Sequence, residues 1–335
     1  MAIERLRCGH HVYIVSSCSE SRAACSMLYD LLQQTVNTLP SEGVSPGQPH
    51  LLQYDLGDDK DVDKAVNDLS QAASGGSLYV IADEVGPDMN GDCFQEMCEK
   101  LLTQVPRLHI WAANCFHGYP PDGWKEENLI RPLRFTPAIL RELKKGLCLV
   151  NYDDILQYSE RGVPDHTDGP PVRQLYHKPQ SHSNLKLFDC VTCGREVASF
   201  LLNLHVGVAE NSNPPSLQWR DMLVLYWCNF SDNSGMVKGL QEAGIPVQLM
   251  TDDDFEDMVN ARRDVVWVVY GDRVHGLERK VVVCLDDYET TDEGEDGNVF
   301  NLTLQRSDTR LYFMSRCTSQ LVIVSNDGLP MSSAQ

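Results

Sequence analysis

Three continuous apolar runs in the C-terminal part of the chain constrain its fold most. These runs are rich in β-branched side chains and show no alternation with polar ones. They are residues 265–270 (VVWVVY), 281–285 (VVVCL) and 321–324 (LVIV). Strands of this composition are buried on both faces, as in a parallel sheet covered by helices. The sequence therefore predicts an α/β fold.

Short turns lead into two of these runs. Gly276-Leu277-Glu278 precedes residues 281–285, and Ser315-Arg316 lies in a helical turn just before residues 317–324. Since parallel strands begin at the same edge of a sheet, these turns should place the Glu278 carboxylate and the Arg316 guanidinium at one edge. We expect Arg316 to be buried there.

The two segments resemble motifs V and VI of UvrD/Rep-type superfamily 1 helicases. Gly276-Leu277-Glu278 matches the core of motif V, and residues 311–317, with Ser315-Arg316 in the Thr-Arg place, match motif VI. Residues 129–139 are similar to motif IV and contain Arg134. The resemblance implies a P-loop NTPase fold with two RecA-like, three-layer α/β/α domains and mainly parallel sheets, the first of them incomplete.

In the first half, an apolar strand at residues 78–82 ends in Asp83-Glu84. The carboxyl ends of strands are where ligands bind in open α/β sheets. In nucleotide motors the first such carboxylate holds Mg²⁺ and the second orients the attacking water. The alternative is a pair of solvated acids at a strand end.

Two further segments of the first half are similar to helicase motifs Ia and III. Residues 12–15 form a predicted strand, and the turn at residues 17–22 matches the loop that contacts single-stranded nucleic acid, although an ordinary strand–helix crossover explains it too. Residues 108–113 resemble motif III, but Asn114 and His117 stand where that motif has Asp and Gln. An Asn cannot supply the charge of an Asp.

The sequence contains no Gly-x-x-x-x-Gly-Lys-Ser/Thr loop, which cradles phosphates in P-loop proteins. We expect a truncated relative, with partner domains upstream of Met1, or one that has lost the loop. The predicted domains are residues 1–122, with motifs Ia, II and III, and residues 123–330, with motifs IV, V and VI.

Cys190-Val-Thr-Cys193 follows His177 and His182 closely in sequence. Cysteine and histidine are the usual ligands of structural zinc. The alternative is that both cysteines start an amphipathic helix and pack as small apolar groups. The other cysteines are scattered singly, which favours reduced thiols in a reducing compartment over a disulfide framework.

Composition restricts the partners. The chain of 335 residues has 28 basic and 48 acidic side chains, a formal net charge of −20. Nucleic-acid-binding surfaces are basic, so single-stranded nucleic acid is a weak candidate partner. No apolar run reaches the roughly 20 residues of a membrane span, and the charged N-terminus is unlike a secretory signal. We expect no membrane partner and an intracellular location, in cytoplasm or nucleus.

Two functions follow. The first is a helicase-like NTPase that binds ATP and Mg²⁺. In the roles that the resemblance implies, Asp83 holds the metal and Glu84 is the base. Arg134 and Arg316 contact the γ-phosphate, and Gly276 and Glu278 contribute to the nucleotide or strand site. Without a phosphate loop, hydrolysis by this chain should be weak or absent. The second is a non-catalytic helicase-like scaffold or regulatory module, which the acidic charge favours.

Overall fold

The computed structural model describes residues 1–19, 21–38, 45–73, 76–83, 85, 91–113, 123–125, 127, 134–143, 145, 168–178, 180–184, 186–209, 217–227, 231–251, 254–286 and 313–326. The chain divides into two compact units: unit 1 is Met1–Glu127 with His275–Leu277, and unit 2 is Asn128–Val274 with Glu278–Gln335. The boundary predicted from the sequence, between residues 122 and 123, stays a prediction.

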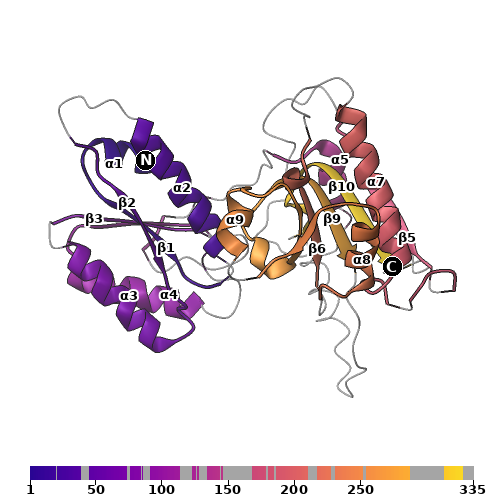
Figure 1. Ribbon diagram of the computed structural model, residues 1–335. Coiled ribbons are helices and arrows are strands. Elements are labelled where there is room, and N and C mark those ends of the chain that lie inside the picture. Colours follow the sequence, from indigo (N-terminus) through magenta and orange to yellow (C-terminus); the bar gives the residue numbers. More distant parts are fainter. Residues whose placement is uncertain are drawn as a thin grey trace, which may run out of the picture. The chain divides into compact units, whose positions relative to one another are not determined.

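Unit 1 is built on a four-stranded sheet (Figure 1). Its order is β2-β1-β3-β4, and all three pairings are parallel. The strands are β1 (Val12–Ser16), β2 (Pro49–Gln53), β3 (Leu78–Ala82) and β4 (Leu108–Ala112). The central strands β1 and β3 are the most buried, in keeping with helices on both faces of the sheet.

Helices cover both faces of this sheet, as Figure 1 shows for α1 and α2 on one side and α3 and α4 on the other. The helices are α1 (Ala2–Arg7), α2 (Arg22–Thr38), α3 (Asp59–Ala72) and α4 (Gly91–Gln104). In α3 the buried positions recur at helical spacing, at Val62, Ala65, Val66 and Leu69. The Asp58 carboxylate caps α3 by accepting the Lys60 N–H at 3.0 Å. Unit 1 is thus a three-layer α/β/α structure.

Unit 2 holds a six-stranded sheet in the order β5-β10-β9-β6-β8-β7, and every pairing is parallel. The strands are β5 (Arg173–His177), β6 (Met222–Tyr226), β7 (Val247–Leu249), β8 (Val266–Tyr270), β9 (Arg279–Asp286) and β10 (Cys317–Asn326). The three apolar runs noted in the sequence are β8, β9 and β10. Their predicted burial in a parallel sheet is confirmed.

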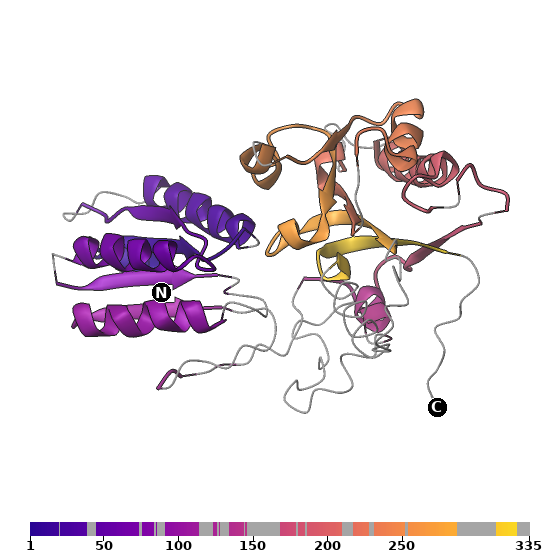
Figure 2. The same ribbon diagram turned by 90° about the horizontal axis from the view of Figure 1, so that it is seen from below.

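The main core of unit 2 lies under α7 (Val191–Ala209) and α8 (Gly235–Glu242). Figure 2 shows these helices on one face and α5 (Pro137–Leu143) on the other. The remaining elements are α9 (Phe255–Val259) and the 3₁₀ turns η2 (Trp219–Asp221) and η4 (Gly271–Val274). A Cβ on Gly239 would meet the Val191 carbonyl oxygen at 2.5 Å, so glycine is what lets α7 and α8 cross closely.

The predicted α/β class with two mainly parallel sheets is confirmed, and the arrangement is consistent with two RecA-like domains. Among the helices in the described part of the chain, none combines the length and apolar character needed to cross a lipid bilayer.

Candidate metal centre and arginine–glutamate cluster

The amino edge of the second sheet gathers three of the residues singled out from the sequence. Glu278 directly precedes β9 and Arg316 directly precedes β10. These strands are parallel neighbours with Cys317 opposite Arg279, and the Arg279 N–H donates to the Arg316 carbonyl at 2.9 Å. Arg316 is buried, as predicted. The expected placement of a carboxylate and a guanidinium at one sheet edge is therefore confirmed.

Arg134 completes this arginine–glutamate cluster of Arg134, Glu278 and Arg316. Its Nη1 donates to Glu278 Oε2 at 2.9 Å, although the two residues are 144 positions apart. The Arg134 side chain is 66% exposed and that of Glu278 is 26% exposed. An ion pair this open to water adds little to stability, so the positive charge remains available to an external anion.

The other nucleotide residues predicted from the sequence are placed as follows. Asp83 follows β3 at its carboxyl end in unit 1, where its carbonyl accepts the Cys25 thiol at 3.6 Å. Gly276 has a φ of 74°, in the left-handed region that favours glycine, and so turns the chain toward β9. Glu84, Asn114 and His117 lie outside the described residues.

The turn that resembles motif Ia has its own internal hydrogen bonds. Between β1 and α2 the Ser21 hydroxyl accepts the N–H groups of Ser17 at 2.9 Å and Cys18 at 3.2 Å. Ser21 also lies 2.8 Å from the Ser16 hydroxyl. The predicted strand, turn and helix are confirmed. Since Ser21 already occupies these amides, the turn forms without any ligand, and a contact with nucleic acid stays a prediction.

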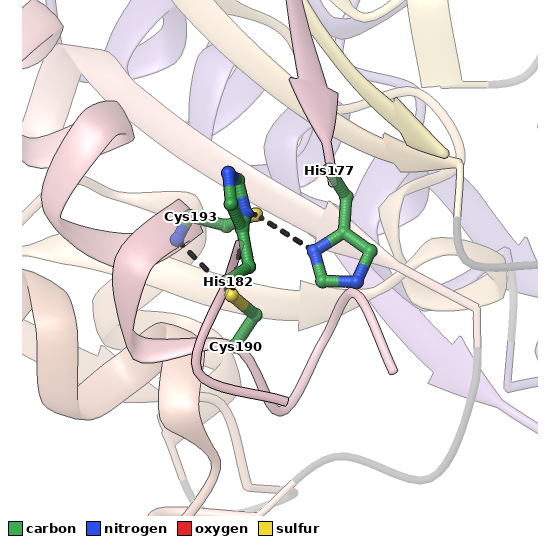
Figure 3. A group of neighbouring side chains, drawn as sticks. All are labelled: His177, His182, Cys190 and Cys193. Carbon is green, nitrogen blue, oxygen red and sulfur yellow. Dashed lines mark hydrogen bonds between the residues drawn. The ribbon is translucent and has the colours of Figure 1, made fainter. Parts of the chain in front are cut away.

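A second cluster, the Cys2His2 cluster, lies at the opposite, carboxyl edge of the same sheet. His177 is the last residue of β5, His182 lies in the loop that follows, Cys190 immediately precedes α7, and Cys193 is in its first turn. One ligand atom from each residue lies within 4.8 Å of all the others. Figure 3 shows the four side chains pointing toward one another from these separate elements.

Short contacts join the members of the Cys2His2 cluster. Cys193 Sγ is 3.3 Å from His177 Nδ1 and 3.2 Å from His182 Nδ1. Cys190 Sγ is 3.6 Å from His182 Nδ1. Three members are closed to solvent: His177 and Cys190 are 0% exposed and Cys193 is 1% exposed. His182 is partly buried, with a side chain that is 6% exposed. The sequence left two interpretations of these residues open, a metal site or thiols packed as apolar groups. The structure brings all four residues together.

The surroundings affect the two thiols in opposite ways. Burial opposes ionisation of Cys190, but hydrogen bonds from the Cys193 N–H and the Ser183 hydroxyl stabilise its thiolate, and its pKa is lowered to about 6. Burial, together with the neighbouring Cys190, raises the pKa of Cys193. The first ionised sulfur therefore makes the second harder to ionise unless a cation lies between them.

Comparisons with known proteins assign no family. No protein-family description matches the chain, and no curated protein matches its sequence. Among solved structures, the chain is similar to the helicase domain of Hef from Pyrococcus furiosus, with 12% identity and a TM-score of 0.27. The alignment covers 96% of this chain and 93% of the Hef chain. A likeness this weak supports no assignment, so the helicase resemblance depends on the motifs.

One arginine of the amino edge was not singled out from the sequence. Arg279, the first residue of β9, is 9% exposed, and it donates to the carbonyl oxygens of Glu278 at 2.8 Å and of Met258 in α9. Burial lowers its pKa to about 10, so it remains charged at neutral pH. The sequence signal was present, as an arginine directly after Gly-Leu-Glu, but only the fold shows that it joins α9 to the sheet.

Proposed function

We propose that this chain is a helicase-like module in which the arginine–glutamate cluster binds the phosphates of a nucleotide, with ATP and Mg²⁺ as the ligands. The supporting observation is that Arg134, Glu278 and Arg316, taken from three separate motifs, lie at one edge of one sheet.

The charges of the cluster suit a polyphosphate. A guanidinium is planar and can donate two parallel hydrogen bonds to phosphate oxygens. Arg316 is buried and its carbonyl accepts a hydrogen bond from β9, so its backbone is held in a defined position, while the exposed Arg134 can reorient. Phosphoryl transfer from ATP spreads negative charge over the transferred group, and arginines that contact it lower the barrier.

The remaining roles of this proposal follow the helicase resemblance. Asp83 at the carboxyl end of β3 would supply a hard oxygen ligand for Mg²⁺, and Glu84 would act as the base. A carboxylate is the ordinary ligand of this ion in nucleotide sites. Glu278 occupies only Nη1 of Arg134, so a phosphate could bind the remaining N–H donors or displace the carboxylate from the 2.9 Å ion pair.

A non-catalytic module is the second candidate, and specific observations favour it. The net charge is −20, the sequence has no phosphate-loop motif, and Arg134 is already paired with a carboxylate. In such a module the arginine–glutamate cluster would only stabilise the sheet edge, and the chain would bind other proteins in place of nucleotide.

Binding of a fluorescent, non-hydrolysable ATP analogue to the full chain, with and without Mg²⁺, separates the two candidates. Under the nucleotide hypothesis Arg134→Ala should weaken binding roughly 10-fold or more, because it removes a charge-assisted hydrogen bond of about 1.5–3 kcal/mol. Arg263→Ala is the matched control: it removes another ion-paired arginine of unit 2, with a side chain 48% exposed. Absence of Mg²⁺-dependent binding by the unsubstituted chain would leave the non-catalytic module.

A further inference from the structure

We infer that His177, His182, Cys190 and Cys193 form a closed structural zinc site that fastens β5 to the start of α7. This inference is independent of the proposed nucleotide function, because the Cys2His2 cluster lies at the opposite edge of the sheet from Arg134, Glu278 and Arg316. A chain that bound zinc but no nucleotide would uphold one and reject the other.

The spacing of the ligand atoms suits zinc. Tetrahedral zinc with ordinary Zn–S and Zn–N bonds of about 2.3 and 2.05 Å places neighbouring sulfur and nitrogen ligands about 3.5 Å apart. Three of the four sulfur–nitrogen pairs in the cluster are separated by 3.2, 3.3 and 3.6 Å. Two thiolates and two imidazoles are one of the standard ligand sets for structural zinc, and they leave no position for substrate.

Groups outside the four ligands also fit this role. The Cys193 N–H donates to Cys190 Sγ at 3.4 Å, which orients a thiolate lone pair. His182 Nδ1 faces the sulfurs while its Nε2 lies 3.9 Å from Glu196 Oε1, so a carboxylate stands on the far side of the imidazole. At 3.9 Å this carboxylate is too far for a direct hydrogen bond, so its effect on the imidazole is electrostatic.

The loop that carries His182 and Cys190 is fixed independently of the metal. Asp189 Oδ1 accepts the Gly235 N–H at 2.8 Å, and the Phe188 carbonyl accepts the Met236 N–H at 3.1 Å. Both contacts join the loop to the first turn of α8. The ligands are therefore held close to their binding positions before an ion enters, which reduces the entropy lost on binding.

Strand β5 explains why a metal is useful here. Among the strands that the structure describes, it lies at the end of the sheet and pairs with β10 alone. Of its five residues only His177 is buried, while Leu175 is partly buried and Tyr176 is 48% exposed. Apolar burial thus contributes little to holding this strand. A metal bond at His177 would anchor its end to the well-packed helix α7.

The alternative function of a Cys-Val-Thr-Cys sequence at the start of a helix is thiol–disulfide exchange. Such exchange requires a thiolate that a partner can reach. Cys190 and Cys193 are 0% and 1% exposed, and two histidines contact them. The closed environment favours zinc. On binding, any cysteine thiol that is still protonated loses its proton to solvent and the imidazoles bind as neutral bases, so Zn²⁺ uptake releases protons.

The test uses the full chain, purified with its thiols reduced. We expect about one zinc per chain by atomic emission, and Co²⁺ exchange should give the visible d–d and thiolate charge-transfer bands of a tetrahedral S2N2 site. Cys193→Ser should weaken zinc affinity roughly 100-fold or more and abolish the cobalt spectrum. Cys317→Ser, which alters another fully buried cysteine of unit 2, should keep both.

Because Cys193→Ser could also unfold the unit, chelation of the unsubstituted protein provides a second measurement. Removing the metal should lower Tm by roughly 10 °C, and zinc added back should restore it. The inference is overturned if the reduced chain carries no zinc and gives no tetrahedral cobalt spectrum, if Cys193→Ser retains full occupancy, or if mass spectrometry finds a Cys190–Cys193 disulfide in the natively purified chain.

Discussion

The two edges of the second sheet carry clusters of opposite character. At the carboxyl edge, the Cys2His2 cluster is sealed, with Cys190 0% exposed. At the amino edge, Arg134 is 66% exposed and paired with Glu278 through a single 2.9 Å contact. The same sheet therefore carries a buried set of soft ligands at one edge and a solvent-exposed ion pair at the other.

This difference in exposure separates stability from ligand binding. Charges in water interact weakly, so the open pair can exchange its partner for a phosphate at little cost. Buried polar groups that lose a partner are costly, so the sealed cluster should be essential to the unit that contains it. Changes at the carboxyl edge should therefore reduce stability, and changes at the amino edge should mainly reduce binding.

The largest effect is expected from His177→Ala. The change removes a zinc ligand and leaves a cavity at the end of β5, and we expect the free energy of unfolding to fall by roughly 3–5 kcal/mol. Urea denaturation measures this change, and hydrogen exchange should show the loss of protection first in β5. The control is His205→Ala, which removes a 3.1 Å hydrogen bond between α7 and the Leu217 carbonyl. Its free energy of unfolding should fall by only about 1 kcal/mol. Equal effects of the two changes would contradict a special role for the carboxyl edge.

Arg279→Met tests whether every arginine at the amino edge is open to ligands. Arg279 is buried and bonds the carbonyls of Met258 and Glu278, so its removal leaves two carbonyl groups without these partners. We expect a loss of roughly 2–3 kcal/mol by urea denaturation, against less than about 1 kcal/mol for Arg134→Ala. If Arg279→Met were as mild as Arg134→Ala, burial would not be what separates the two classes of arginine.

Gly239→Ala addresses the helix crossing that supports the Cys2His2 cluster. The new Cβ would lie 2.5 Å from the Val191 carbonyl oxygen and 2.7 Å from the Arg195 nitrogen, both of them backbone atoms of α7. We expect the unfolding free energy to fall by roughly 2 kcal/mol, since overpacking outweighs the better helix propensity of alanine. Bound zinc per chain should fall with it.

The control for this crossing is Lys238→Ala, a change at the neighbouring position of α8, where the side chain is exposed. It alters one side chain of the same helix without adding an atom at the crossing, and should change stability by no more than about 0.5 kcal/mol. A Gly239→Ala protein as stable as this control, with full zinc, would show that α7 can shift without cost to the cluster.

The sequence predicted local structure well and long-range contacts less well. The β-branched runs of β8, β9 and β10 indicated buried parallel strands because composition alone reports burial on two faces. The positions of Glu278 and Arg316 followed from their place just before two such strands. The contact between Arg134 and Glu278 did not, because it joins residues 144 positions apart and depends on how α5 packs.

The Cys2His2 cluster shows the same limit. The spacing of its ligands matches no familiar zinc pattern closely, and two cysteines at a helix start also fit simple packing. What decides their proximity is the loop between β5 and α7, which the Asp189–Gly235 and Phe188–Met236 hydrogen bonds fold back onto α8. Those contacts depend on the tertiary fold, so no local pattern in the sequence could reveal them.

The smallest effect is expected at the open ion pair itself. A double-mutant cycle with Arg134→Ala and Glu278→Gln should give a coupling free energy of roughly 0.2–1 kcal/mol by urea denaturation at low salt, because the pair is largely solvated. Added salt at about 1 M should remove most of it, since screening then acts within a few ångströms. The pair of Arg195 with Glu242, whose side chains are 62% and 52% exposed, provides a matched cycle with no predicted ligand. A coupling well above 1 kcal/mol that survives salt would mean that Glu278 holds Arg134 firmly, and the amino edge would then resemble the carboxyl edge in serving stability before binding.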